Sequence, residues 1–273
     1  MAIITISREL AALGDETAQE LANLLEYRFI NKSALEERIK SYGIADHKFQ
    51  RYDERKPSFL ASLSQDRDDY LHYLKTAVLA EAGKGDAVII GRGANVIFKN
   101  VPGVLSVFLG SPMPVRLERV KSYFHCDDKR AKQIIEQSDK DRKGFHHYFF
   151  DMEWRQPGNY HLALNTGHLR PSVCAEIIKY MMDQIITPKI EEMNGFRLKE
   201  LILAHEIKHH ILYNTETPIH FLETEVFHGQ VTLYGVANAQ SVAEAAVLAA
   251  QELVNADAIR SEIQVVQEYN IIP

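Results

Sequence analysis

Apolar residues in the first part of the chain form short continuous runs that alternate with segments of helical period. The runs lie at 2–6, 86–90, 104–109 and 160–166. The segments with helical period lie between or after them, at 15–27, 33–43, 70–82, 113–124 and 172–187. Strands that are uniformly apolar and alternate with helices are typical of a parallel sheet covered on both faces. The pattern predicts an α/β fold over residues 1–187.

The pattern changes beyond residue 197. Residues 198–213 have helical period, 220–226 and 230–236 alternate around His228-Gly229, 240–254 is an alanine-rich helix, and 259–266 is a strand. This α-β-β-α-β order predicts a second, small α+β domain over 198–273 with one exposed sheet face. The stretch 188–197, which contains Asn194-Gly195, is the predicted linker. Two polar stretches have no predicted strand or helix: 46–68, expected to run over the surface, and the charged segment 129–143.

Charge is distributed unequally between the two predicted domains. The chain of 273 residues has a net charge of −6, of which residues 198–273 contribute −7. An acidic domain is poorly suited to nucleic acid or anionic lipid. No signal peptide or membrane span is apparent, which favours a cytoplasmic protein, and Cys126 and Cys174 show no disulfide or metal-site pattern. The oligomeric state stays open.

The first strand, its loop and the following helix have the layout of a phosphate-binding site. In this arrangement the unpaired N–H groups and the positive dipole of a helix N-terminus point at one spot. The P-loop pattern G-x-x-x-x-G-K-[ST] is not met, because if Gly14 is its second glycine, Glu9 replaces the first and Asp15 replaces the lysine. Each missing glycine also removes backbone freedom near the phosphates.

Four segments in this order resemble the cytidylate kinase-like family of P-loop nucleoside monophosphate kinases. They are Ile4-Thr-Ile-Ser-Arg8 with Leu13-Gly-Asp-Glu16, Val88-Ile-Ile-Gly-Arg-Gly-Ala94, Val115-Arg-Leu-Glu-Arg119, and Asp139-Lys-Asp-Arg142 with Tyr160-His-Leu-Ala-Leu-Asn-Thr166. The resemblance covers residues 1–187. It implies transfer of a phosphoryl group from ATP, with Mg²⁺, to CMP or dCMP. Such catalysis depends on positioning and on neutralising the charge of the transferred group.

The resemblance also implies roles for individual residues. Arg8 would replace the P-loop lysine as a catalytic cation, and Arg119, Arg130 and Arg142 would come from the lid. Arg92, between Gly91 and Gly93, would hold the acceptor phosphate. The other implied nucleotide-binding residues are Gly14, Asp15, Glu16 and Thr17 in the loop and Asn165 and Thr166 near the donor base. Thr17 is either a hydroxyl ligand of Mg²⁺ or an ordinary first-turn residue, and each arginine has the alternative of a solvated surface charge.

Asp15 suggests a second hypothesis, in which the site is closed. As a helix N-cap it would accept from the N–H of Thr17 or Ala18 and occupy the position of a phosphate. Nucleotide binding would then be weak, and whether the protein is an enzyme stays open. The alternative function is a non-catalytic nucleotide sensor or scaffold.

The second domain resembles a BON domain, and the match is carried by Gly229-Gln-Val-Thr-Leu-Tyr-Gly-Val236, 243–254 and Ile263-Gln-Val-Val266. This resemblance implies a module that binds a protein partner. The helix before it contains His205-Glu-Ile-Lys-His209, which matches the zinc-protease pattern H-E-x-x-H. A domain of this size has no obvious substrate cleft, so we expect a polar helix face and no metal site.

Overall fold

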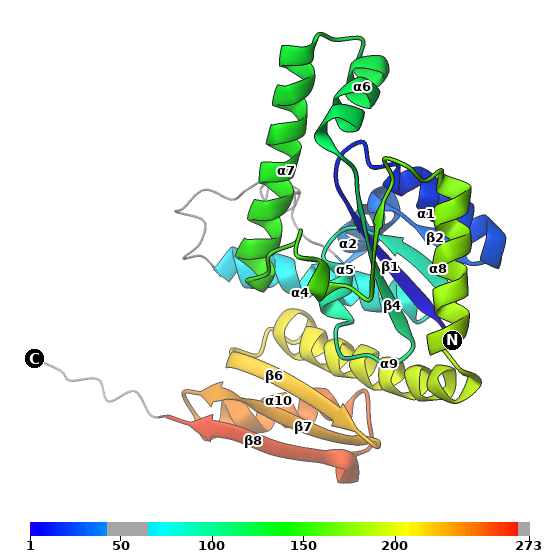
Figure 1. Cartoon of the computed structure of the whole chain (residues 1–273). Helices are drawn as coiled ribbons and strands as arrows, with labels where there is room; N and C mark the ends of the chain where they lie inside the picture. The colour runs from blue at the N-terminus through cyan, green and yellow to red at the C-terminus, as the bar shows by residue number, and fades with distance from the viewer. Residues whose placement is uncertain (43–64, 267–273) are drawn as a thin grey trace, which may run out of the picture. The chain divides into compact units, whose positions relative to one another are not determined.

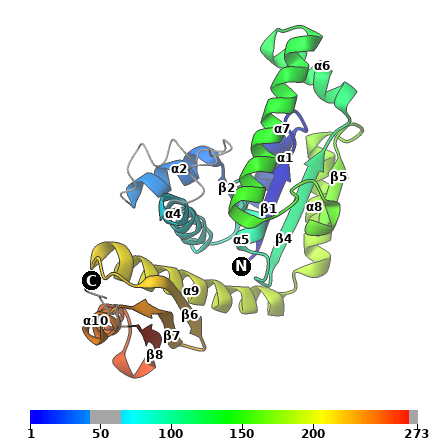
Figure 2. The same cartoon turned by 90° about the vertical axis from the view of Figure 1, so that its left-hand side faces the viewer.

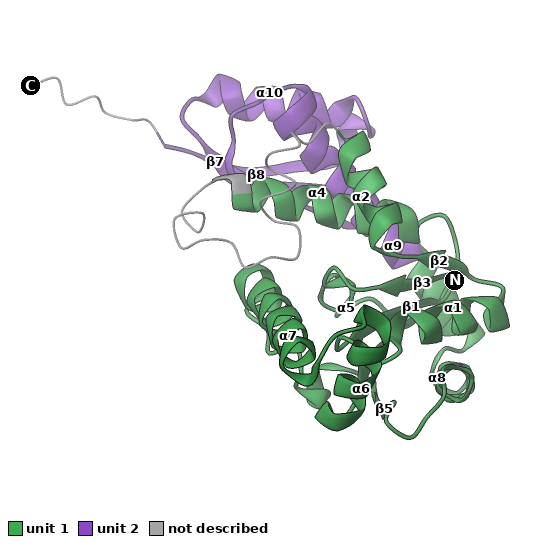
Figure 3. Cartoon of the chain, turned by 90° about the horizontal axis from the view of Figure 1, so that it is seen from above, with its two compact units in different colours: residues 1–195 green, residues 196–273 purple. Residues whose placement is uncertain are grey.

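The computed structural model describes residues 1–42 and 65–266. It divides the chain into two compact units, Met1–Gly195 and Phe196–Pro273 (Figures 1 and 3). Most of the stretch 46–68, which we expected to run over the surface, lies outside the described residues, as does Gly43. The two units are described separately below.

Unit 1 contains a five-stranded parallel sheet in the order β2-β3-β1-β4-β5. Its strands are β1 (Ile3–Arg8), β2 (Arg28–Ile30), β3 (Ala87–Ile90), β4 (Val104–Gly110) and β5 (Leu162–Asn165). The central strand β1 pairs with β3 on one side and with β4 on the other, as Ile6 lies opposite both Ile90 and Val107. The carboxyl end of β1 therefore lies in the middle of the sheet edge where α/β proteins bind ligands.

Helices cover both faces of this sheet, as the sequence predicts. Those of unit 1 are α1 (Gly14–Leu25), α2 (Lys32–Ser41), α4 (Gln65–Ala82), α5 (Ala94–Ile97), α6 (Met113–Phe124), α7 (Asp128–Phe150) and α8 (Pro171–Ile185). On one face, Leu21 of α1 and Ile178 of α8 share a buried cluster with Ile4 and Ile6 of β1. α4, α5 and α7 lie on the other side of the sheet (Figure 2).

The charged segment 129–143 and the aromatic residues after it form one long helix, α7, which the sequence pattern did not predict. Its N-cap is Asp127, whose side chain accepts from the N–H of Arg130. Ala131 and Ile135 are buried against Val120 of α6, so the two helices form a hairpin. The apolar positions are too widely separated among charges for the sequence alone to show a helix.

Unit 2 has the predicted α-β-β-α-β order. After α9 (Pro188–His209) and a short π-helical turn come β6 (His220–Phe227), β7 (Gln230–Ala237), α10 (Gln240–Gln251) and β8 (Ile259–Val265). β7 is antiparallel to β6 and parallel to β8. Ile207 and Ile211 pack with Val231, Leu233 and Ala246 in one buried cluster. The predicted linker 188–197 is instead helical, because α9 begins at Pro188, a favoured first helical residue, and continues through Asn194-Gly195.

Candidate functional site

The loop between β1 and α1 enters the helix without a side-chain cap. Leu13 is the N-cap residue, with a left-handed backbone (φ 53°, ψ 35°), and no side chain caps the helix. The prediction that Asp15 is the N-cap is wrong. Since α1 already begins at Gly14, Asp15 lies within the first turn, and its side chain is 64% exposed. The first N–H groups of α1, which have no partner within a helix, are therefore not closed off by this carboxylate.

Arg8 lies directly over the start of α1. A Cβ added at Gly14 would overlap the Cβ and Cγ atoms of Arg8, so only glycine allows the arginine to cross here. The Arg8 side chain is 12% exposed, and its Nε atom is 3.6 Å from Oδ2 of Asp15. The cation that replaces the P-loop lysine therefore lies at the predicted position, and a carboxylate partly neutralises it.

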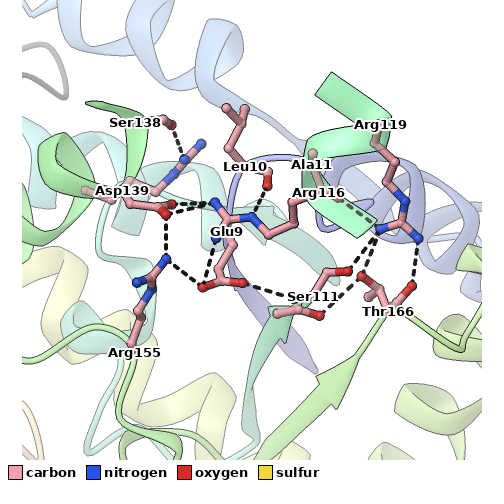
Figure 4. Close-up of polar contacts among 12 residues, drawn as sticks. Glu9, Leu10, Ala11, Ser111, Arg116, Arg119, Ser138, Asp139, Arg155 and Thr166 are labelled. Carbon is pink, nitrogen blue, oxygen red and sulfur yellow. Dashed lines mark hydrogen bonds and ion pairs between the residues drawn. The ribbon is translucent and has the colours of Figure 1, made fainter. Parts of the chain in front are cut away.

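The residues that replace the usual glycines attach the loop to the α6–α7 hairpin. Leu10 and Ala11 pack against the buried cluster of Val120, Ala131 and Ile135. Their carbonyl oxygens accept from two arginines of α6, Arg116 Nε at 2.8 Å and Arg119 Nη1 at 2.9 Å (Figure 4). The left-handed backbone of Ala11 (φ 60°) and Leu13 is held by these contacts in place of glycine flexibility.

Glu9 takes part in a compact cluster of two arginines and two carboxylates that our sequence reasoning missed. Arg116, 2% exposed, is bidentate to Asp139 at 2.7 and 2.9 Å, and its Nη1 lies 3.4 Å from Oε1 of Glu9. Arg155 contacts the same two carboxylates, at 2.7 Å to Glu9 and 2.5 Å to Asp139 (Figure 4). The other Glu9 oxygen accepts from the N–H of Ser111 at 3.0 Å. The charges balance, which explains how a carboxylate is tolerated in this loop.

Three of the predicted arginines line one small cavity at the carboxyl ends of β1 and β3. Arg8, Arg92 and Arg142 surround it together with Ser7 and Gly91, and its remaining wall is formed by Phe145, His146 and Trp154. His146 and Trp154 are stacked, with ring centroids 6.1 Å apart. Cationic side chains therefore converge from the sheet and from α7 on a space enclosed by aromatic rings.

Arg92 is a buried cation and not a surface charge. It has a left-handed backbone (φ 55°) between Gly91 (φ 80°) and Gly93 (φ 67°). Its side chain is 0% exposed, and Nη2 donates to Oε1 of Glu36 at 2.5 Å. A Cβ at Gly93 would overlap the ring of Phe150, so this turn packs directly under the end of α7.

The other predicted residues are placed separately from this cavity. Arg119 donates to the carbonyl oxygen of Thr166 at 2.8 Å, and burial lowers the pKa of its guanidinium. Asn165 is exposed, and its side chain accepts from the N–H of Gly167. Arg130 is exposed at the start of α7, and the exposed Glu16 occupies the Ser/Thr position of the P-loop pattern. The buried Thr17 hydroxyl donates to the Leu13 carbonyl at 2.7 Å, as an ordinary first-turn residue does.

The histidines of α9 lie in a helical face without a metal-binding constellation. His209 stacks on Tyr213, with ring centroids 5.2 Å apart, and His210 Nε2 is 2.9 Å from Glu252. Within residues 1–42 and 65–266, no group of three or more His, Cys, Asp or Glu side chains is placed to hold a metal ion. Within the same residues, no helix is both long and apolar enough to cross a bilayer.

Unit 1 is a kinase-like α/β fold of the P-loop type, with an arginine-lined cavity beside the phosphate-binding loop. The model of the cytidylate kinase-like family matches residues 3–168, and the chain belongs to this family. The model of the BON domain matches residues 200–267, which make up most of unit 2.

Solved structures show the same fold for unit 1. An uncharacterized protein from Eubacterium ventriosum is 22% identical, with a TM-score of 0.54 over 67% of this chain and 99% of that one. A shikimate kinase from Bacteroides thetaiotaomicron is 14% identical, with a TM-score of 0.40 over 67% of this chain and 97% of that one. One from Acinetobacter baumannii in complex with shikimate is also 14% identical, with a TM-score of 0.41 over 68% and 96%. No functionally curated protein matches the chain significantly.

Proposed function

We propose that unit 1 is a cytidylate-type nucleoside monophosphate kinase whose affinity for ATP is reduced by Asp15. The observation that carries this proposal is the convergence of Arg8, Arg92 and Arg142 on one cavity beside the uncapped start of α1. Arginine is well suited to this role, because its planar fork of donors matches phosphate oxygens. CMP or dCMP is the proposed acceptor, with its phosphate at these arginines. Because ATP is the donor, we place the activity in the cytoplasm.

The start of α1 fits the phosphates of ATP. Its first N–H groups and the helix dipole attract an anion, and Arg8 adds a positive charge beside them. Mg²⁺ would be held by the carboxylates of Asp15 and Glu16 in the first turn, since the Thr17 hydroxyl already donates to a carbonyl. When bound, ATP supplies the phosphoryl group and Mg²⁺ neutralises its oxygens.

Asp15 opposes this binding. A carboxylate 4 Å from one phosphate charge costs about 4 kcal/mol at an effective dielectric constant of 20, and solvent at this exposed position screens much of that repulsion. Its ion pair with Arg8 also diverts the nearest cation. Both effects act on the donor, whereas Arg92 and Arg142 are left to bind the acceptor.

The second candidate is a non-catalytic nucleotide sensor that uses the BON-like unit to bind a protein partner. It is favoured by the same Arg8–Asp15 pair and by the position of Glu9, whose carboxylate stands where the P-loop pattern has its first glycine. In this case unit 1 binds a monophosphate without turnover. The two candidates differ in whether ATP with Mg²⁺ binds and reacts.

The experiment is a thermal-shift and calorimetric panel with CMP, dCMP, UMP, AMP and ATP with Mg²⁺, together with direct detection of CDP. The kinase proposal predicts stabilisation by CMP, weaker stabilisation by ATP, and CDP formation. Asp15→Asn should tighten ATP binding about tenfold, equivalent to ~1.4 kcal/mol, and leave CMP affinity unchanged. Glu20→Gln, an equally exposed carboxylate farther along α1, is the matched control and should have no effect.

The possible outcomes separate the candidates. Stabilisation by a monophosphate alone, with no CDP formed by the wild type or by Asp15→Asn, supports the sensor. Absence of binding by every nucleotide contradicts both candidates.

A further inference from the structure

The strand β8 leaves one side of its backbone without a strand neighbour. Within the described residues, β8 lies at the edge of the sheet β6-β7-β8 and pairs only with β7 (Figure 1). The N–H of Val266 donates to the carbonyl of Ala237 at 2.9 Å, so the backbone groups of residue 266 point toward β7. Because these directions alternate along a strand, the N–H and C=O groups of Ile259, Ser261 and Ile263 point outward.

The position of Ile263 agrees with this assignment. Its N–H lies 3.5 Å from the Ser261 hydroxyl, at the limit of a hydrogen bond. A row of outward N–H and C=O groups is a template for another strand, and monomeric proteins usually protect such edges.

The two faces of β8 carry different side chains. On the solvent face, Arg260 and Glu262 form an ion pair at 2.5 Å, with side chains 71% and 41% exposed. On the other face, Ser261 and Ile263 line a groove whose opposite wall is α10, including Val247 and Leu248. Leu248 is 62% exposed, so the groove has an uncovered apolar wall beside the open edge.

We propose that a second copy of this chain occupies this edge, with the two β8 strands antiparallel about a two-fold axis at Ser261. In this register Ser261 lies opposite Ser261 of the other copy, and Ile259 lies opposite Ile263 on the groove face. On the solvent face, Arg260 of each copy lies opposite Glu262 of the other. The strand is therefore complementary to itself in charge on one face and in apolar character on the other.

The backbone directions fit the same register. Residues 259, 261 and 263, whose groups point outward, form the hydrogen-bonded pairs of the antiparallel ladder. Arg260 and Glu262 then form the non-hydrogen-bonded pairs, where opposite side chains come closest and charge complementarity has the most effect. A shift by two residues in either direction leaves Arg260 without Glu262 opposite it. A six-stranded sheet results, in which neither copy keeps an open β8 edge.

The test is the mass of the full-length protein in solution, measured by light scattering and by sedimentation over a wide range of concentrations. We expect a dimer that dissociates on dilution. Arg260→Glu and Glu262→Arg each place like charges opposite one another and should raise the dimer dissociation constant about tenfold or more. The combined charge reversal R260E/E262R restores opposite charges and should return the constant to within about threefold of the wild-type value.

Two further variants control for folding and for charge. Ser261→Pro removes an N–H at the centre of the proposed ladder, but that N–H points away from β7, so the fold is kept and the dimer is lost. Glu225→Arg makes an equal charge change on β6 and should leave the dimer unchanged. A wild-type protein that is monomeric at all concentrations overturns the proposal, as does a charge reversal no better than the single variants.

Discussion

At the scale of single residues, the contact between Arg8 and Gly14 determines how the phosphate-binding loop is built. The arginine is at the end of the central strand and the glycine is the first residue of α1. The arginine side chain fills the space that any Cβ at position 14 would need. Gly14 therefore serves the placement of a side chain, in addition to any approach of a phosphate to the backbone.

Gly14→Ala should destabilise unit 1 by about 1–3 kcal/mol, because the added Cβ has to displace the Arg8 side chain or the loop. Trp154, the single tryptophan, is buried in unit 1, so its fluorescence during urea unfolding measures this loss. The matched control is Gly195→Ala, within α9, where an added Cβ meets no atom within 4 Å. That variant should be neutral or slightly stabilising, since alanine favours a helix. Equal effects of both substitutions would contradict the role of Arg8.

Sequence reasoning found the cations of the site more easily than their counter-charges. Arg8 and Arg92 lie where strands end beside glycines, so their positions follow from local pattern. The pairing of Arg92 with Glu36 joins residues far apart in the chain. The cluster of Glu9 with Arg116 and Arg155 also depends on how α6, α7 and the following segment fold together. The one available signal was a glutamate in a loop expected to bind anions, which requires a nearby cation.

At the scale of elements, the strands were predictable because buried parallel strands are continuous apolar runs, as in β3 and β4. Helices were harder to predict where burial is sparse. α7 buries a few residues among many charges, and α9 passes through an Asn-Gly pair that usually favours a turn. In α9 the Asn194 side chain donates to the Met1 carbonyl at 2.7 Å and is fully buried. A tertiary contact therefore outweighs the local preference.

The contact of the loop with the α6–α7 hairpin gives a prediction at this scale. Leu10→Gly removes the apolar side chain that packs against Val120 and Ala131, and it also loosens the loop backbone. Amide hydrogen exchange should become roughly tenfold faster in α6 and in the first half of α7, corresponding to ~1.4 kcal/mol of local stability. Mass spectrometry of the peptides checks this. Leu10→Met preserves the volume and should match the wild type, whereas unchanged exchange in Leu10→Gly would contradict the contact.

At the scale of the whole molecule, the chain combines two units of different charge and different chemistry. The acidic charge is concentrated in residues 198–273, and the arginine-lined cavity is in unit 1. Histidines of α9 and the turn after it, including His209 and His210, lie in unit 2. A change of pH near neutrality therefore reaches the two units through different groups.

Acidification should destabilise unit 2 through His209. Burial, and to a lesser extent the neighbouring His210, lowers the pKa of His209 below 6.5, so the unfolded chain binds its proton more readily than the folded one. The stability that the neutral ring contributes is complete above pH 6.5 and is lost as the pH falls through the lowered pKa. Urea unfolding followed by circular dichroism at pH values of about 7.5 and 5.5 reports both units, whereas Trp154 fluorescence reports unit 1 alone. We expect a larger acid shift in the part of the circular dichroism transition that Trp154 does not follow. His209→Gln should reduce that shift, and an undiminished shift in this variant would assign the pH dependence to other groups.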